Sequence, residues 1–443
     1  MARLAGGQTL SSSLSSLAAR AAGPSGACTC QGTLWGGDGD PEPCPVHAAP
    51  CYDANNCCAA GQSQDCAADE ARRERRDQRY ALLERLSRIT VHPEFAKRVA
   101  VCQHPIPGQV VVKSRDGTAF PACVSTCGSM FCPVCAPKIR ARRAEDFGDA
   151  VAGWLRRGLD HDAWMVRLSA RNTVDLPEKE AVDRALKGWA RLRNRRAWRN
   201  LAERYGLHYI RALEQTHGEN GWNVHLHVVF ATRAADPALV LAHLALTLRR
   251  LWPDVMASLG FYADPRAAVH VQQVDAATAA EAGGYLAKAS AWGVGDEIAR
   301  GDLKLGKLAG RTYEQVLADY DRAPNPVDLA LIREHHDALW GRRQFSWSRG
   351  FRELLGMKEE LSDDQAAAEV ESPDDEEIAV IDGRTYYTML RRRQVGALLD
   401  CAETGGLAKV YAFVVDTLGY PPGSVVAPRP DLTRRQPLRE ARP

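Results

Sequence analysis

The chain has 443 residues, of which 25% are charged and 45% are hydrophobic, and its formal net charge is +2. This length allows two or more domains, and the near-neutral charge means that any nucleic-acid affinity must come from local basic patches. No apolar run approaches the roughly 18 residues of a membrane helix, so we expect no membrane partner.

The 13 cysteines are compatible either with disulfides in a secreted protein or with metal-bound thiolates in a reducing compartment. A Cys-x-x-Cys pair is present, and the N-terminus has no hydrophobic signal core. Both features favour metal-bound thiolates and a cytoplasmic location.

The composition predicts five regions. Residues 1–70 are Gly/Ala/Ser/Pro-rich and predict a disordered leader. A small extra zinc module that uses His47 is the alternative for this leader. Its cysteines are Cys28, Cys30, Cys44, Cys51, Cys57, Cys58 and Cys66. The other expected regions are a helix with a cysteine module (71–150), a main domain (151–356), an acidic linker (357–377), and a small helical appendage with a disordered tail (378–443).

The second region begins with a helix expected over 69–89 and continues into a cysteine cluster. Cys132-x-x-Cys135 is a knuckle that presents two thiolates to one ion, and Cys127 is close enough to supply a third. Cys102 and Cys123 are the candidates for the fourth ligand of a structural zinc. Four cations that could contact phosphate follow, unless they form a solvated helix face: Lys138, Arg140, Arg142 and Arg143.

The main domain alternates predicted strands and helices. Strands are expected at 164–169, 207–214, 223–230 and 269–274, and helices at 178–205, 237–251 and 276–289. The β-α-β-β-α-β order is the split βαβ pattern, an α+β ferredoxin-like antiparallel sheet with helices on one face. The latter part of helix 178–205 is strongly basic, and Arg195 and Arg196 are candidate DNA-backbone contacts.

Two histidines lie one residue apart in the strand at 223–230. His225 and His227 therefore point to one face, as a two-point metal clamp would require. Asn220-Gly221 predicts a type I′ hairpin turn before this strand. Glu214 could then lie across from the histidines and complete a His-His-carboxylate site for a divalent ion.

In the predicted helix 276–289, Glu281, Tyr285 and Lys288 fall on one face. The structural alternative is an amphipathic helix with Tyr285 in the core. Further on, cations alternate with aromatic residues, which suits single-stranded DNA, although a packed strand is the competing interpretation. These cations are Arg342, Arg343 and Arg349.

The segment Glu214-x-Thr-x-Gly-x-Asn-Gly-Trp-x-x-His225-x-His227, followed by Glu281-x-x-x-Tyr285-x-x-Lys288, resembles the motifs of the HUH endonucleases. Within this superfamily the chain resembles rolling-circle plasmid replication initiators of the Gram-positive and actinobacterial type, and the resemblance runs from about Lys97 to Gly356.

The resemblance implies a strand-specific DNA nickase. Tyr285 would be the nucleophile, Lys288 would orient the phosphate, and Glu281 would activate water in termination. It implies Mg²⁺ or Mn²⁺ at the histidine site, and it favours Cys102 as the fourth zinc ligand. The implied partners are the plasmid double-strand origin, single-stranded at the nick, and a host helicase.

Two other functions stay open at this point. The first is a relaxase or transposase with the same chemistry. The second is a zinc-containing DNA-binding regulator without catalysis.

Overall fold

The computed structural model describes residues 64–89, 92–106, 108–274, 310–368 and 372–428. The chain divides into two compact units, Met1–Glu70 and Ala71–Pro443, and all described residues from Ala71 onward belong to the second. The expected leader up to residue 63, the expected helix 276–289 with Glu281, Tyr285 and Lys288, and the tail from 429 lie outside the described residues.

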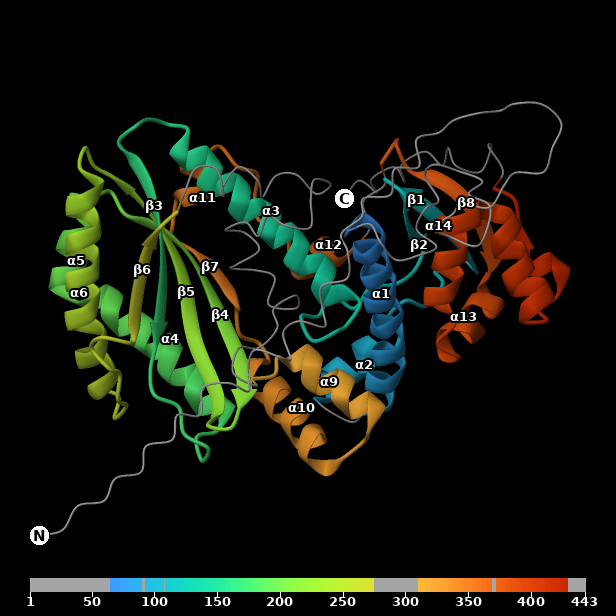
Figure 1. Ribbon diagram of the computed structural model, residues 1–443, viewed down its shortest axis with the longest axis horizontal. Helices are drawn as coiled ribbons and strands as arrows, with labels where there is room; N and C mark the ends of the chain where they lie inside the picture. The colour runs from blue at the N-terminus through green and yellow to red at the C-terminus, as the bar shows by residue number, and fades with distance from the viewer. Residues whose placement is uncertain (1–63, 90–91, 107, 275–309, 369–371, 429–443) are drawn as a thin grey trace, which may run out of the picture. The chain divides into compact units, whose positions relative to one another are not determined.

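A five-stranded sheet forms the main domain, in the order β6-β3-β5-β4-β7 with every neighbouring pair antiparallel (Figure 1). Its strands are β3 (His161–Ser169), β4 (His208–Gly218), β5 (Gly221–Arg233), β6 (Val269–Gln273) and β7 (Phe345–Trp347). In this order β5 lies between β3 and β4, and β6 flanks β3 on its other side. The expected antiparallel sheet with helices is confirmed.

Three helices cover one face of this sheet. They are α4 (Glu178–Asn194), α5 (Arg196–Arg204) and α6 (Pro237–Ala257), and they pack in one core with the inward-facing apolar residues of β3 and β5. The single helix expected at 178–205 is divided, because Arg195 adopts an extended conformation with φ −68° and ψ 135°. Arg195 therefore acts as the C-cap of α4 and the N-cap of α5.

Helices lie on both faces of the sheet, which corrects the expected one-sided arrangement. The helix α3 (Cys135–Leu155) packs on the other face through a second apolar core that includes Phe147, Met165 and Val229. In Figure 1, α3 lies on the side of the sheet opposite α5 and α6. Because β3 and β5 carry apolar residues on both faces of the sheet, helices must shield both faces from water.

A second sheet joins two distant parts of the chain, in the order β2-β1-β8-β9. Its strands are β1 (Gln109–Arg115), β2 (Thr118–Ala122), β8 (Glu376–Asp382) and β9 (Val425–Val426). The sequence predicts a separate small appendage at 378–443. Instead, β8 pairs antiparallel with β1, so the described part of this region belongs to the second sheet. Two C-terminal helices, α13 (Gly383–Arg391) and α14 (Val395–Tyr411), pack on this sheet.

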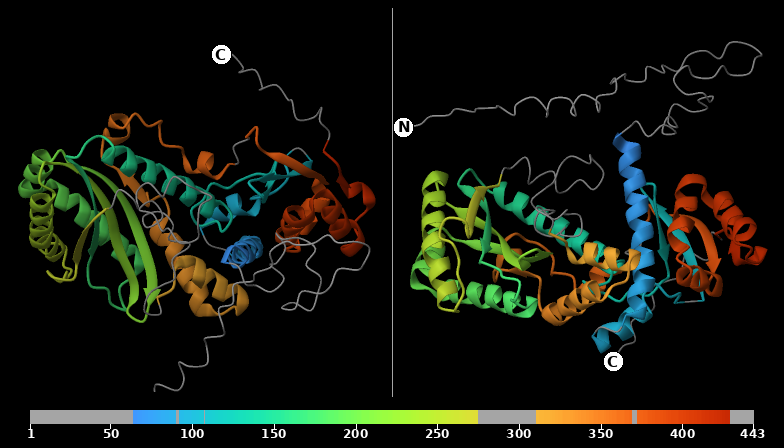
Figure 2. Two further views of the ribbon diagram at one scale, coloured as in Figure 1. Left: turned by 45° about the horizontal axis from the view of Figure 1, so that its top comes forward. Right: turned by 60° about the horizontal axis from the view of Figure 1, so that its bottom comes forward.

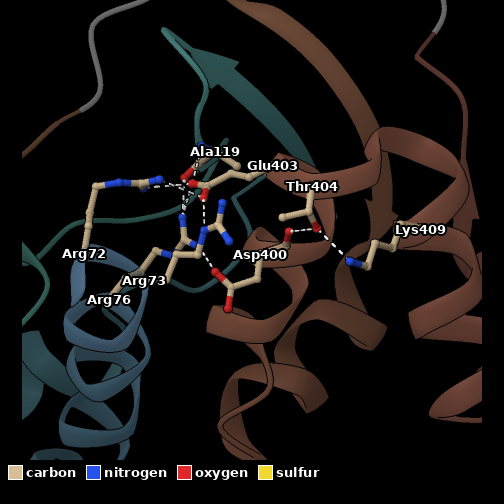
Figure 3. A network of polar contacts seen from close by, with 8 residues as sticks. All are labelled: Arg72, Arg73, Arg76, Ala119, Asp400, Glu403, Thr404 and Lys409. Carbon is tan, nitrogen blue, oxygen red and sulfur yellow. Dashed lines mark hydrogen bonds and ion pairs between the residues drawn. The ribbon is translucent and has the colours of Figure 1, made fainter. Parts of the chain in front are cut away.

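An ion cluster joins α14 to α1 (Gln64–Arg88), which runs beside the C-terminal helices (Figure 2). The carboxylate of Glu403, 1% exposed, accepts hydrogen bonds from Arg72, Arg73 and Arg76 and from the amide of Ala119 (Figure 3). One carboxylate therefore holds three guanidinium groups of the N-terminal helix.

The predicted acidic linker is instead packed structure. It contains α12 (Asp363–Ala367), which contacts α3 and buries Ala366 and Ala367 completely. The small apolar side chains explain how so acidic a segment can pack on the core. The remaining elements are α2 (Pro93–Ala100), α9 (Tyr313–Arg322), α10 (Pro326–Leu339), α11 (Phe351–Leu354), η6 (Ala412–Thr417) and η7 (Pro422–Ser424).

Within the described ranges, none of the helices has both the length and the apolar character needed to cross a membrane.

Candidate functional site

The β4–β5 hairpin sets the position of the candidate ligands. Glu214 pairs directly with His225 in the antiparallel register, and Gly218 pairs with Gly221 at the turn. The turn is not the expected type I′. Of its residues only Gly221 has a positive φ, of 75°, whereas type I′ requires positive φ at both central residues. The register that the turn was expected to set is nevertheless the one that places Glu214 beside the histidines.

The side chains of Glu214, His225 and His227 converge on one face of the sheet. The Nε2 atom of His225 lies 3.5 Å from Glu214 Oε1, and that of His227 lies 3.2 Å from Oε2. One donor atom from each residue lies within 4.8 Å of the others. Metal–ligand bonds of about 2.0–2.2 Å fit donors at this spacing. The group could therefore bind a divalent ion through two imidazole nitrogens and one carboxylate.

Burial supports this interpretation. Both histidines are 7% exposed, and the Nδ1 atom of His225 has no hydrogen-bond partner in the described structure. Arg140 and Glu214 line the same small cavity of about 30 Å³, and Arg140 forms an ion pair of 3.2 Å with Glu314. The Arg140 guanidinium thus lies inside the protein next to the site, and not on an open phosphate-binding surface.

A polar network anchors the hairpin to the helices. The indole of Trp222 donates a hydrogen bond of 2.9 Å to Glu334, whose other oxygen accepts from the amide of Glu178 at 2.8 Å. The buried carboxylate of Glu178 lies 2.7 Å from His335 Nδ1. Burial raises the pKa of Glu178, and His335 opposes this rise. The network connects β5 to α4 and α10, and so fixes the strand that carries the histidines.

The structure brings four cysteines together: Cys102, Cys127, Cys132 and Cys135. The Sγ atom of Cys102 lies 3.7 Å from that of Cys132 and 3.6 Å from that of Cys135, and Cys127 lies 3.7 Å from Cys135. Cys123, the runner-up from sequence, is exposed and lies outside the cluster. Four sulfurs at this spacing match the donor set of a structural zinc, so the group could bind metal.

The cysteine cluster is built into the core. Burial raises the pKa of the Cys132 thiol, whereas hydrogen bonds from the neighbouring thiols lower that of Cys135. Four thiolates would repel one another unless a cation neutralised them. Cys135 begins α3, whose far half packs on the five-stranded sheet, so the cluster and the sheet share one helix.

Several predicted DNA contacts are instead engaged within the protein. Arg143 is 5% exposed and binds Leu361 O and the carboxylates of Glu360 and Asp363. Arg142 donates to backbone carbonyls of α12.

Arg342 pairs with Asp183 on α4, and Lys138 is half-buried. The competing interpretation of a packed strand holds for the segment between Arg342 and Arg349, because it forms β7. The predicted contacts that stay exposed are Arg195, Arg196, Arg343 and Arg349.

Two polar residues that were not predicted from the sequence lie on the histidine face. Ser169 pairs in register with His225, and Arg167 pairs with His227. The alternation at 164–169 predicts the strand, but only the register shows which strand neighbours the histidines.

The fold and the two clusters define a class: a mixed α/β protein with antiparallel sheets, a buried four-cysteine group and a Glu-His-His group, either of which could bind metal. The chain is similar to "Protein rep" of Streptomyces lividans, with 27% identity over 320 residues that cover 57% of this chain and 68% of the relative.

It is also similar to a "Neomycin resistance protein" of Streptomyces cyanogenus, with 29% identity over 153 residues that cover 28% of this chain and 34% of the relative. No family model matches the chain. No solved structure matches it.

Proposed function

We propose that this protein initiates rolling-circle replication of a plasmid by nicking one strand of the origin DNA. The convergence of Glu214, His225 and His227 on one face of a split βαβ sheet carries the proposal. This is the arrangement that the resemblance to HUH endonucleases implies, and the relative named "Protein rep" supports a replication role.

In the proposed reaction, the phenol oxygen of Tyr285 attacks the scissile phosphorus. A bond from tyrosine to phosphorus forms, the bond from phosphorus to the 3′ oxygen breaks, and that oxygen takes up a proton. The products are a 5′-phosphotyrosine and a 3′-hydroxyl that primes synthesis.

A phenol with a pKa of about 10 is roughly one part in a thousand ionised at neutral pH, so the nucleophile needs activation. Mg²⁺ or Mn²⁺ bound by Glu214, His225 and His227 would supply Lewis-acid stabilisation of the phosphate charge. Lys288 would orient the phosphate.

The segment that carries Tyr285 lies outside the described residues, but both of its flanks are fixed on the sheet. Val274 donates its amide to Ala163 O at 2.8 Å, and it belongs to the core beneath α3. At the other flank, Arg311 and His217 exchange two backbone hydrogen bonds of 2.8 and 2.7 Å beside the hairpin turn. Both flanks are thus anchored on the sheet that carries the Glu214/His225/His227 group, which supports the proposal.

Glu281 has a separate proposed role, the activation of water in the terminating cleavage. Glu281→Ala protein should nick as well as wild type but should fail to release itself by hydrolysis. If the first nick were lost too, this division of roles would be wrong. The Cys102/Cys127/Cys132/Cys135 group would hold a structural Zn²⁺, and a host helicase would extend the unwound region after nicking.

The test compares wild-type, Tyr285→Phe and Glu214→Gln proteins. Each is incubated with circular single-stranded origin DNA in Mn²⁺ or in EDTA, and covalent protein–DNA adducts are resolved on a denaturing gel. We expect an adduct only with wild-type protein and only with Mn²⁺, because both substitutions remove a required group.

An adduct that survives Tyr285→Phe would move the nucleophile elsewhere. Origin binding without any adduct would favour the non-catalytic regulator. Adduct formation on transfer-origin or transposon-end DNA, but not on a replication origin, would favour a relaxase or transposase.

A further inference from the structure

An arginine lies in the interior of the five-stranded sheet, on the face that carries the metal-ligand candidates. Arg167 is in β3, where it pairs with His227 on one side and with His270 on the other. Paired residues of neighbouring strands project to the same face, with Cβ atoms about 4.5–5.5 Å apart. The sheet thus presents a row of His270, Arg167 and His227 across three adjacent strands.

This row lies where the cover of the sheet ends. One row away, Met165 and Val229 are buried in the core beneath α3. Two residues further along β3, Arg167 is exposed, and so is His270 on β6. A strand in the interior of a sheet is normally covered, so the two exposed neighbours Arg167 and His270 mark an uncovered polar part of this face, beside the buried His227.

Among the described residues, no neighbouring acid balances the charge of Arg167. In the described part of the chain, no carboxylate lies within ion-pairing distance of its guanidinium. Arg140, Arg143 and Arg342, by contrast, each pair with an acid. Glu214 lies on β4, on the far side of β5 from β3. Arg167 therefore flanks the Glu214/His225/His227 group on the side away from its carboxylate.

We infer that Arg167 and His270 form a phosphate-binding site for the backbone of a single DNA strand lying across this face. Neighbouring strands are about 4.8 Å apart. An arginine one strand away from His227 can therefore reach a phosphate bound at the Glu214/His225/His227 group, or the next phosphate along the DNA strand. The planar guanidinium offers paired donors that match phosphate oxygens, and His270 adds an imidazole beside it. This inference rests on the proposed function, because it takes DNA to be the ligand of the face.

The test is the salt dependence of single-stranded DNA binding, measured by fluorescence anisotropy with a labelled origin oligonucleotide in EDTA. Each phosphate contact contributes about 0.7 to the slope of log K against log salt for a single strand. Arg167→Gln should therefore lower that slope by about 0.7 and weaken binding at low salt. Arg167→Lys should keep the slope, because it keeps the charge.

Arg250→Gln is the matched control, because Arg250 is exposed on α6, the helix that covers the opposite face. It should bind like wild type. Melting temperatures check that each variant folds, and Arg167→Met is a second neutral variant if Gln is not tolerated. An unchanged slope in a folded neutral variant overturns the inference, as does the absence of DNA binding by wild type.

Because this assay needs no metal and no cleavage, its result is separable from the adduct experiment. A lowered slope together with no adduct in wild-type protein would refute the nickase and leave the phosphate site standing. An adduct in wild type together with an unchanged slope in Arg167→Gln would do the reverse.

Discussion

Replacing Glu403 with glutamine should lower the free energy of unfolding by about 2–3 kcal/mol at pH 7. Burial alone would raise the pKa of this carboxyl, but hydrogen bonds from Arg72 and Arg76 and from the amide of Ala119 outweigh it and hold the pKa at about 2 (Figure 3). The usual pKa of a glutamate is near 4.3, and one unit is worth about 1.4 kcal/mol, which gives about 3 kcal/mol. Solvent screening at Arg72 and Arg73, each about one third exposed, reduces this figure.

The pH dependence has a definite sign. Because the folded pKa of Glu403 is depressed, its stabilisation is fully present above about pH 4.5 and is lost as pH falls toward the folded pKa of about 2. Urea unfolding followed by circular dichroism at pH 7, 5, 4 and 3 should show the gap between wild type and Glu403→Gln narrowing below about pH 4.5.

Glu376→Gln is the control, because Glu376 is an exposed residue of β8. It should change stability by less than about 0.5 kcal/mol. Equal stabilities of wild type and Glu403→Gln at pH 7, or a gap of constant size between pH 7 and pH 3, would refute the argument that the arginine cluster stabilises this carboxylate.

Further predictions concern the metal groups and the hairpin. Elemental analysis should detect zinc in purified wild-type and Cys123→Ala protein but not in Cys135→Ala protein. Wild-type protein without zinc would contradict the site. Gly221→Ala should lower the melting temperature and weaken Mn²⁺ binding, because φ is 75° and an added Cβ would lie 2.8 Å from Thr173 O. Gly260→Ala is the control, because Gly260 has φ 81° and no atom lies within 4 Å of the added Cβ, so it should lower only the melting temperature. Equal Mn²⁺ affinities of wild type and Gly221→Ala would show that the hairpin tolerates the change.

The local pattern predicts much of the main sheet. The strand at 223–230 alternates around His225 and His227, and the turn residues before it predict a second strand opposite. Glu214 is therefore a candidate from the sequence, and the strand register places it beside His225. The four thiolates can likewise be selected from spacing and resemblance. The strand pattern, the turn residues and the cysteine spacing each lie within a short stretch of the chain, so they can be recognised in the sequence.

Long-range packing is less legible. Nothing near β1 indicates that its partner is β8, and the acids of 359–377 resemble a linker because their arginine partners on α3 are distant in sequence. The intramolecular partners of Arg142 and Arg143 were not predicted for the same reason, since a basic run has the same sequence pattern whether it faces solvent or an acidic segment. Arg167 is not predicted from the sequence because its significance depends on the register with β5.

The second sheet imposes an order on folding during synthesis. β1 and β2 leave the ribosome before the main domain, whereas β8, which pairs with β1, is made only after all five strands of the main sheet. Until β8 arrives, one edge of β1 has unpaired backbone groups and can pair with another chain. The arginines of α1 likewise lack their carboxylate partner until Glu403 has been synthesised. The C-terminal segment thus completes a sheet whose strand β1 lies between Cys102 and Cys127 in the chain. A nascent chain that stops before β8 would be prone to aggregate or to bind chaperones.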